Sequence, residues 1–253
     1  MSSIVFERKN GYARITLNRP PVNALNIEML TEIGDAIENL HNEDHTKLII
    51  INSACRVFSA GIDMTDHAPS KVFQLLEAFH KIFLVMADLA KPTLAAVNGA
   101  ALGAGCELAT FCDLVVADEN AKFGQPEIKV GVFPPIAAIV FPYLVGKRKA
   151  LELILTGETV EAREALSLGL INRVVPPEKL EESTLQLASK MTANSGPVLQ
   201  MTKKAMISAE GRRFEDALKT AEDLYLNQLM ALEDTNEGLR AFIEKRSPIW
   251  KDK

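Results

Sequence analysis

Cysteines are few in this sequence, and basic residues form no long run. Of the 253 residues only Cys55, Cys106 and Cys112 are cysteines, an odd number without the spacing of metal ligands. We interpret them as reduced thiols of the core, which is typical of a cytoplasmic protein. The formal net charge is −5, so we do not expect nucleic acid as a partner.

Long hydrophobic stretches are also missing. No apolar run approaches the roughly 18 residues that a membrane-spanning helix needs. The first residues lead directly into a strand-like pattern, without a basic or apolar leader segment. We therefore expect no membrane partner and a cytoplasmic location.

Several catalytic motifs are absent as well. The sequence has no Gly-x-Ser-x-Gly elbow and no phosphate-binding loop, and Gly99, Gly103 and Gly105 do not match the dinucleotide fingerprint. None of the four histidines lies in a nucleophile-like setting. For His67, which follows a small-residue turn, a pocket position and a surface position both remain open.

The sequence does contain a regular alternation of strand-like and helix-like segments. Runs at 4–8 and 12–17 flank an Asn10-Gly11 pair, a strong signal for a β-hairpin. Apolar residues with a helical period cover 27–40 and 72–89, and short apolar runs at 48–51 and 93–97 are typical of buried strands. This order predicts an α/β fold with a largely parallel sheet.

The C-terminal part of the chain is expected to be mostly helical. A short strand at 171–175 interrupts the helical segments, which we predict at 136–144, 147–155, 162–168, 178–193, 197–208, 214–232 and 236–245. A helical layer of this kind could provide contacts between subunits.

The stretch 98–127 combines a buried strand, a turn of small residues and a helix that starts near Ala104. Small residues allow a ligand to approach the backbone, and the first N–H groups of a helix favour negative charge. Glu107 lies one turn inside this helix, and Glu127 follows a Gly-Gln-Pro turn. We expect the two carboxylates to converge beside the helix start. The alternative is a packing turn followed by surface glutamates.

Motifs along nearly the whole chain resemble the enoyl-CoA hydratase/isomerase (crotonase) family. They are NRP at 18–20 with NAL at 23–25, FSAGID at 58–63, KP at 91–92 with VNG at 97–99, GAGCEL at 103–108, CD at 112–113, FGQPE at 123–127, LTG at 155–157, Ala165 with GL at 169–170, EG at 237–238, AF at 241–242 and KR at 245–246. The resemblance implies a crotonase-like spiral of ββα repeats over residues 1–195. It also implies a C-terminal helical region over 196–253 that forms trimers or dimers of trimers.

The resemblance also implies a site. The backbone N–H groups of Ile62 and Ala104 occupy the positions of the family's oxyanion hole for a thioester carbonyl. Hydratases of the family carry two glutamates at the positions of Glu107 and Glu127, and this chain has both. The expected activity is addition of water across the conjugated double bond of an enoyl-CoA, with acid and base roles left open. An isomerase of the same family and a non-catalytic acyl-CoA-binding protein remain as alternatives.

Coenzyme A enters as part of the substrate, so no cofactor and no metal are implied. The resemblance places its binding along Ala60, Asp63 and Met64, with Arg56 and Lys245 as candidate partners of the phosphates. Lys245 could reach the site from a neighbouring subunit, and for both cations a solvated surface position is the alternative.

One loop departs from the simple hydratases. Pro134, Pro135 and Ile136 stand where many of them have a glycine-rich turn, and we expect these residues to shape the acyl pocket. The run GVFPP at 131–135 is similar to hydratases of cyclic dienoyl-CoA substrates such as cyclohexa-1,5-diene-1-carbonyl-CoA. A short-chain or medium-chain enoyl-CoA is the alternative substrate.

Overall fold

The computed structural model describes residues 2–9, 11–41, 43 and 45–253. Within these residues, one sheet has six strands in the order β1-β2-β3-β4-β6-β9 and a second has three in the order β5-β7-β8. The strands of the larger sheet are β1 (Ile4–Lys9), β2 (Gly11–Leu17), β3 (Thr46–Ser53), β4 (Thr93–Val97), β6 (Leu114–Asp118) and β9 (Arg173–Val175). Only the β1–β2 pair of this sheet is antiparallel. The predicted α/β fold with a largely parallel sheet is therefore confirmed.

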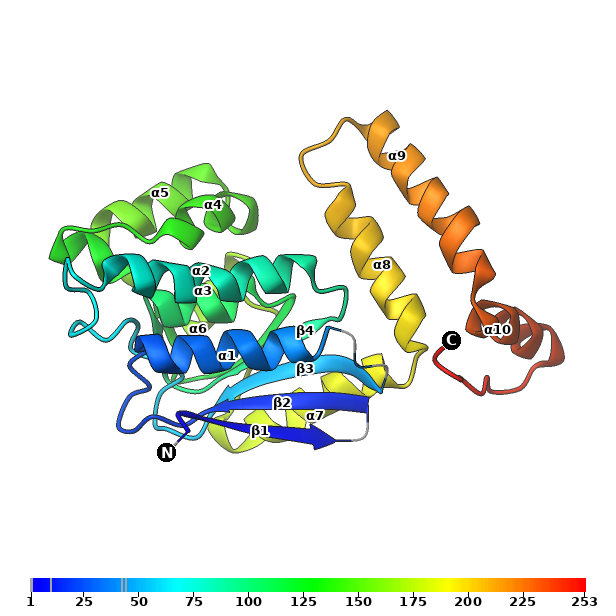
Figure 1. Cartoon of the computed structure of the whole chain (residues 1–253), viewed down its shortest axis with the longest axis horizontal. Helices are drawn as coiled ribbons and strands as arrows, with labels where there is room; N and C mark the ends of the chain where they lie inside the picture. The colour runs from blue at the N-terminus through cyan, green and yellow to red at the C-terminus, as the bar shows by residue number, and fades with distance from the viewer. Residues whose placement is uncertain (1, 10, 42, 44) are drawn as a thin grey trace.

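The central strand β3 is buried on both faces at residues 48–51, which explains the apolar run there. Ile49 and Ile51 belong to the main core, together with buried residues of α1 (Ile27–Asn39) and α2 (Val72–Asp88). Leu48 and Ile50 point to the other face and pack with Ala188 of α7 (Leu180–Thr192). Figure 1 shows α1 and α2 on one side of the strands and α7 on the other.

The smaller sheet lies next to the helix that carries Glu107. Its strands are β5 (Ala100–Leu102), β7 (Lys122–Gly124) and β8 (Thr159–Glu161). The helices that contact it are α3 (Ala104–Phe111) and α6 (Ala162–Ser167). The 3-10 helix η1 (Pro126–Val130), α4 (Pro135–Leu144) and α5 (Lys147–Thr156) connect β7 to β8. Because β5 leads directly into α3, the end of this strand and the start of the helix form one short turn.

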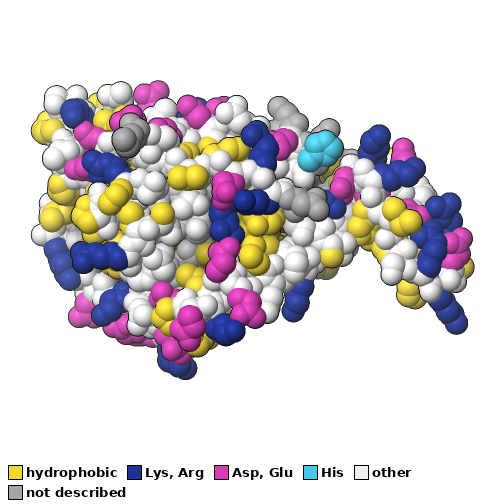
Figure 2. Space-filling view, turned by 90° about the horizontal axis from the view of Figure 1, so that it is seen from below, with side chains coloured by type: hydrophobic (Ala, Val, Ile, Leu, Met, Phe, Trp, Pro, Cys, Tyr) yellow, Lys and Arg dark blue, Asp and Glu magenta, His cyan; other side chains and the backbone are white. Residues whose placement is uncertain are grey.

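Three helices extend away from this body as an arm. They are α8 (Gly196–Ser208), α9 (Phe214–Asp223) and α10 (Glu233–Glu244), and Figures 1 and 2 show them as a narrower part of the molecule. The arm begins at Ser195, whose side chain accepts a hydrogen bond from Val198 N and so caps α8. The division into a spiral core at 1–195 and a helical trimerisation region at 196–253 stays a prediction.

The C-terminal tail ties the end of the arm back to its base. The buried carboxylate of Asp234 accepts hydrogen bonds from Lys251 N at 2.8 Å and Asp252 N at 2.9 Å. Asp252 in turn accepts from Gly196 N at 2.9 Å and pairs with Lys47 Nζ of β3 at 2.7 Å. The arm is therefore attached to the body at both of its ends.

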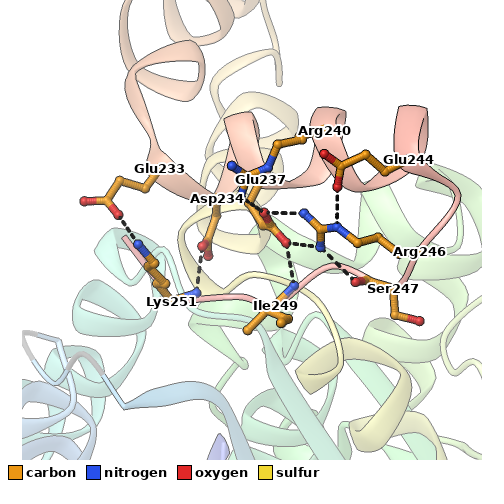
Figure 3. A network of polar contacts seen from close by, with 9 residues as sticks. All are labelled: Glu233, Asp234, Glu237, Arg240, Glu244, Arg246, Ser247, Ile249 and Lys251. Atoms are coloured by element: carbon orange, nitrogen blue, oxygen red, sulfur yellow. Dashed lines mark hydrogen bonds and ion pairs between the residues drawn. The ribbon is translucent and has the colours of Figure 1, made fainter.

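A second polar cluster joins α10 to the same tail (Figure 3). Glu237 accepts from Arg240 and Arg246, and it also accepts from the backbone N–H of Ile249 at 2.9 Å. These donors hold the pKa of the Glu237 carboxyl well below its usual range, with the Arg246 hydrogen bonds as the largest cause. The tail is thus fixed along most of its length.

Some predicted elements differ from the structure. The expected helix at 214–232 ends at Asp223 and continues as a π-helical segment (Leu224–Gln228) and a 3-10 segment (Leu229–Ala231). Apolar periodicity does not separate these helix types here, because segments of five and three residues are too short for their different periods to be recognised. The last helix begins at Glu233 rather than 236, and β9 covers only Arg173–Val175 of the strand expected at 171–175.

The smallest strands were not predicted. β5, β7 and β8 have three residues each, which is too short for a period of two to be recognised. The segment 58–63 makes two isolated bridges, Ser59 with Ala101 and Ile62 with Leu25. The hairpin of β1 and β2 is confirmed, whereas Asn10 of its turn lies outside the described residues.

Candidate active site

Two turns that are far apart in the sequence touch each other at the start of α3. Ser59 N donates to Ala100 O at 3.1 Å, and Leu102 N donates to Ser59 O at 3.0 Å. A Cβ atom at Gly61 would lie 3.0 Å from Leu102 O and 3.7 Å from Ala104 N. The 59–62 turn therefore packs directly against the 102–104 turn, and residue 61 has no room for a side chain.

The backbone N–H groups of Ile62 and Ala104 flank this contact. The bonds Leu25 N to Gly61 O and Asp63 N to Leu25 O lie on either side of Ile62, at 2.8 and 2.9 Å. Ala104 is the first residue of α3, where a helix leaves its N–H groups without intrahelical partners. Neither Ile62 N nor Ala104 N has a hydrogen-bond acceptor within the described residues. Both amides are available to a ligand oxygen.

Glu107 lies one turn further along α3 and is only 2% exposed. One of its carboxylate oxygens, Oε1, accepts hydrogen bonds from Ile136 N and Ala137 N, each at 2.8 Å. Burial, the largest cause, raises the pKa of this carboxyl, the charge of Glu127 also raises it, and the two N–H groups lower it. The net result is a rise of the pKa from 4.5 to about 7. Glu107 is thus held in place while its proton stays exchangeable near neutral pH.

Glu127 lies on η1, with its carboxylate against the backbone of Gly103. A Cβ atom at Gly103 would be 2.5 Å from Glu127 Oε1. The other oxygen, Oε2, is buried without a hydrogen-bond partner in the part of the chain that the structure describes. Burial raises the pKa of Glu127 as well. The structure therefore brings Glu107 and Glu127 together beside Ala104.

A cluster of polar side chains, Arg19, Asn23 and Asp63, fixes the 59–63 turn. Arg19 donates to Asp63 Oδ2 at 2.8 Å and to Ala24 O at 2.7 Å, and Asn23 Nδ2 donates to Phe58 O at 2.9 Å. The other oxygen of Asp63 accepts from the next turn of the chain, at Thr65. The side chain of Asp63 is therefore committed to shaping the turn, and its backbone N–H and C=O are also engaged, with Leu25 O and Asp66 N.

The other predicted binding residues are more scattered. Ala60, Met64 and Arg56 lie exposed on the loops around the 59–63 turn. Lys245 is exposed at the C-terminal end of α10, on the arm, and Figure 1 shows α10 well away from α3. Within one chain, Lys245 and Arg56 are not brought together. His67 follows the turn, half buried, and nothing places it in a pocket.

Pro134, Pro135 and Ile136 form the start of α4, with Pro134 buried and the other two half buried. A role for their side chains in an acyl pocket stays a prediction. The backbone N–H of Ile136 has a role that the sequence did not reveal, because it donates to Glu107. In the described residues, no group of three or more His, Cys, Asp and Glu side chains could hold a metal ion, and no helix could span a membrane.

The sequence pattern of the enoyl-CoA hydratase/isomerase family matches residues 7–253. The chain belongs to this family. It is 39% identical to a Mycobacterium tuberculosis protein named "Probable enoyl-CoA hydratase", over 97% of this chain and 96% of that protein. It is 37% identical to the 2,3-dehydroadipyl-CoA hydratase of Escherichia coli, over 99% of both chains.

A solved structure agrees with these matches. The enoyl-CoA hydratase of Bacillus anthracis superposes with a TM-score of 0.95 at 29% identity, over 100% of each chain. The predicted family and the crotonase-like fold are therefore confirmed, and the names of the relatives support the expected hydratase class.

A methyl group at residue 103 should displace Glu127. In Gly103→Ala we expect turnover of an enoyl-CoA substrate to fall by about 10²-fold, because a shift of about 1 Å in a reacting group has a cost of that size. The measurement is kcat at saturating substrate.

Gly131→Ala is the matched control. Gly131 also has a positive φ, +82° against +52° for Gly103, but no atom lies within 4 Å of its Cβ position. This variant carries the backbone strain without the contact with Glu127. Equal loss of activity in both variants would contradict the placement of Glu127.

The raised pKa of Glu107 predicts an unusual dependence of stability on pH. A carboxyl with a higher pKa in the folded than in the unfolded state binds more protons when folded, so its contribution falls as pH rises from about 4.5 to about 7. At pH 8 the buried charge should cost up to about 3 kcal/mol.

Glu107→Gln removes this charge. We expect its free energy of unfolding in urea to exceed that of the natural protein at pH 8 but to match it near pH 4.5. The exposed Glu222→Gln on the arm is the control, for which the two curves should run in parallel. The prediction is wrong if Glu107→Gln behaves like this control.

Proposed function

We propose that this protein is a hydratase that adds water across the conjugated double bond of an enoyl-CoA thioester. The observation that supports the proposal is that the carboxylates of Glu107 and Glu127 both lie beside the start of α3, near the N–H groups of Ile62 and Ala104, which have no acceptor among the described residues. The N–H pair can stabilise the charge that the reaction develops, and the carboxylate pair can transfer its protons.

The N–H pair answers the requirement for charge stabilisation. When the oxygen of water attacks the β carbon, electrons move into the thioester and its carbonyl oxygen becomes negatively charged. Two fixed donors stabilise that charge without reorganising, and loss of one such donor typically costs about 10²–10³ in rate. The 59–62 and 102–104 turns are held against each other by hydrogen bonds of Ser59, so the donors are ordered before the substrate binds.

The carboxylates answer the requirement for proton transfer. One carboxylate takes a proton from the attacking water, and one carboxylic acid delivers a proton to the α carbon, so that a C–O and a C–H bond form and the double bond is consumed. Both groups have a raised pKa, and an interacting pair titrates jointly. The buried, unpaired Oε2 of Glu127 is a free acceptor for the water or the product hydroxyl.

For the acyl group we propose a cyclic dienoyl thioester, with a short-chain or medium-chain enoyl-CoA as the alternative. Support comes from Pro134 and Pro135, which stiffen the chain beside Glu107. We place coenzyme A along Ala60 to Met64, with Arg56 and a neighbouring subunit's lysine at position 245 as phosphate partners. No metal or redox group takes part in the proposed reaction, and we keep the cytoplasm as its proposed location.

The test is a panel of thioesters, with crotonyl-CoA and cyclohexa-1,5-diene-1-carbonyl-CoA, followed by loss of conjugated absorbance in ¹⁸O-labelled water. We expect labelled oxygen in the product, and a fall in kcat of about 10²–10⁴-fold in Glu107→Gln and in Glu127→Gln. A shifted double bond without labelled oxygen would instead support an isomerase. Unchanged turnover in a variant with both Glu107→Gln and Glu127→Gln would show that the two carboxylates do not take part in the reaction.

We further propose that the protein forms a trimer or a dimer of trimers through its arm. The arm exposes large apolar side chains, with Phe242 85% exposed, although its base is firmly tied by Asp234 and Asp252. Burying such a surface favours association. Light scattering should give a mass of three or six chains, and a monomer at micromolar concentration would refute this assembly.

A further inference from the structure

The first turn of α4 has an unusual set of hydrogen-bond donors. An α-helix begins with four backbone N–H groups that have no intrahelical acceptor, at the N-cap and the next three positions. In α4 the N-cap is Pro134 and the first helical residue is Pro135, and proline has no N–H. The two donors that remain are Ile136 N and Ala137 N, and both donate to Glu107 Oε1 at 2.8 Å.

The helix proper begins directly after these two residues. Ala138 N donates to Pro134 O at 3.0 Å, which is the first bond of the regular helical pattern. All free donors of this helix start are therefore directed to a single oxygen atom of Glu107. No further N–H of the turn competes for the carboxylate or for a ligand beside it.

The prolines also restrict the backbone at this point. Pro134 is buried in an extended conformation with φ −80° and ψ 107°, which a following proline favours, and Pro135 has the fixed φ that suits a first helical position. The turn has few other conformations, so the two N–H groups keep their direction.

We propose that the Pro134–Pro135 pair is a positioning device for Glu107, which it holds by one carboxylate oxygen so that the other remains free to bind the reacting water. This inference rests on the proposed hydratase activity. The two prolines act through Ile136 N and Ala137 N, and they are positioning residues rather than catalytic ones.

The titratable groups that face Glu107 are few. On its own helix the Cys106 thiol is buried, and on η1 the Glu127 carboxylate is close enough to raise the pKa of Glu107. Among the elements that pack on α3, β4 and β5 carry no titratable side chain. Asp118 of β6 accepts from Asn120 N at 2.9 Å, and Tyr143 of α4 is exposed. The N–H pair is thus the main group that favours the ionised form.

The test compares two proline pairs that occupy equivalent positions. Pro134→Gly with Pro135→Gly frees the helix start beside Glu107. The control is Pro176→Gly with Pro177→Gly, because Pro176 and Pro177 are the N-cap and first residue of η2 (Pro177–Lys179) and are exposed. Both double variants lose the same two rings.

Two readouts are measured on the full-length protein. The first is the titration midpoint of Glu107, followed by ¹³C NMR of carboxyl-labelled glutamate without substrate and assigned with Glu107→Gln. The second is the dependence of kcat on pH. In the Pro134/Pro135 variant we expect the midpoint to rise by about one pH unit. Glu107 stays buried there, but the more flexible turn holds Ile136 N and Ala137 N in hydrogen-bonding position for only part of the time. The value of kcat at pH 6 should then fall about 10-fold and recover towards pH 9.

The control variant should match the natural protein in both readouts. The inference is overturned if the midpoint does not move, or if kcat falls equally at every pH, since either result would show a merely structural role. If the Gly variant does not fold, Pro135→Ala, which keeps a good helix former, is measured in the same way, with a smaller shift in the same direction expected. If the natural protein hydrates no thioester, the proposed function fails, while the NMR titration still decides the positioning role.

Discussion

The close approach of the 59–62 turn to the 102–104 turn is the constraint on which the site depends. Gly61 allows it, because a Cβ atom there would press on Leu102 O, and Gly103 likewise allows Glu127 Oε1 to approach the second turn. Ser59 connects the turns by backbone bonds in both directions. The backbone N–H of Ile62 thus belongs to a loop and that of Ala104 to a helix start, and neither has an acceptor among the described residues.

Glu107 shows how stability and function oppose each other here. A carboxyl that is 2% exposed is a poor choice for a stable core, and burial accordingly moves its pKa to about 7. The start of α4 offsets part of that cost with two charge-assisted hydrogen bonds. The balance leaves a group that can gain or lose a proton near neutral pH, which is the property that acid–base chemistry requires.

The arm, in contrast to the site, exposes apolar side chains. Its interior contacts are few, and its large apolar side chains face outwards, yet its two ends are tied to the body by the buried Asp234, by Asp252 and by Lys47. Lys203 of α8 adds a further anchor, a 2.7 Å pair with Asp113. A firmly anchored element with an apolar outer surface is suited to receive another protein surface without moving.

Much of this protein could be predicted from its sequence. The order of strands and helices follows from apolar periodicity. Residues 27–40 have one apolar stripe, which is typical of a helix packed on a core, and residues 48–51 are all apolar, which is typical of a strand covered on both faces. The motifs around Glu107, Glu127 and Ala104 also indicated the family, which the comparisons confirm.

Only the tertiary structure decided how the site is held. Ile136 N lies 29 residues from Glu107 in sequence, and nothing local marks it as a donor to that carboxylate. The same is true of the space beside Gly103, which is filled because η1 brings Glu127 back to it. The physical reason is that periodicity records which side of a segment is buried, whereas the partner of a polar group depends on where the chain comes back.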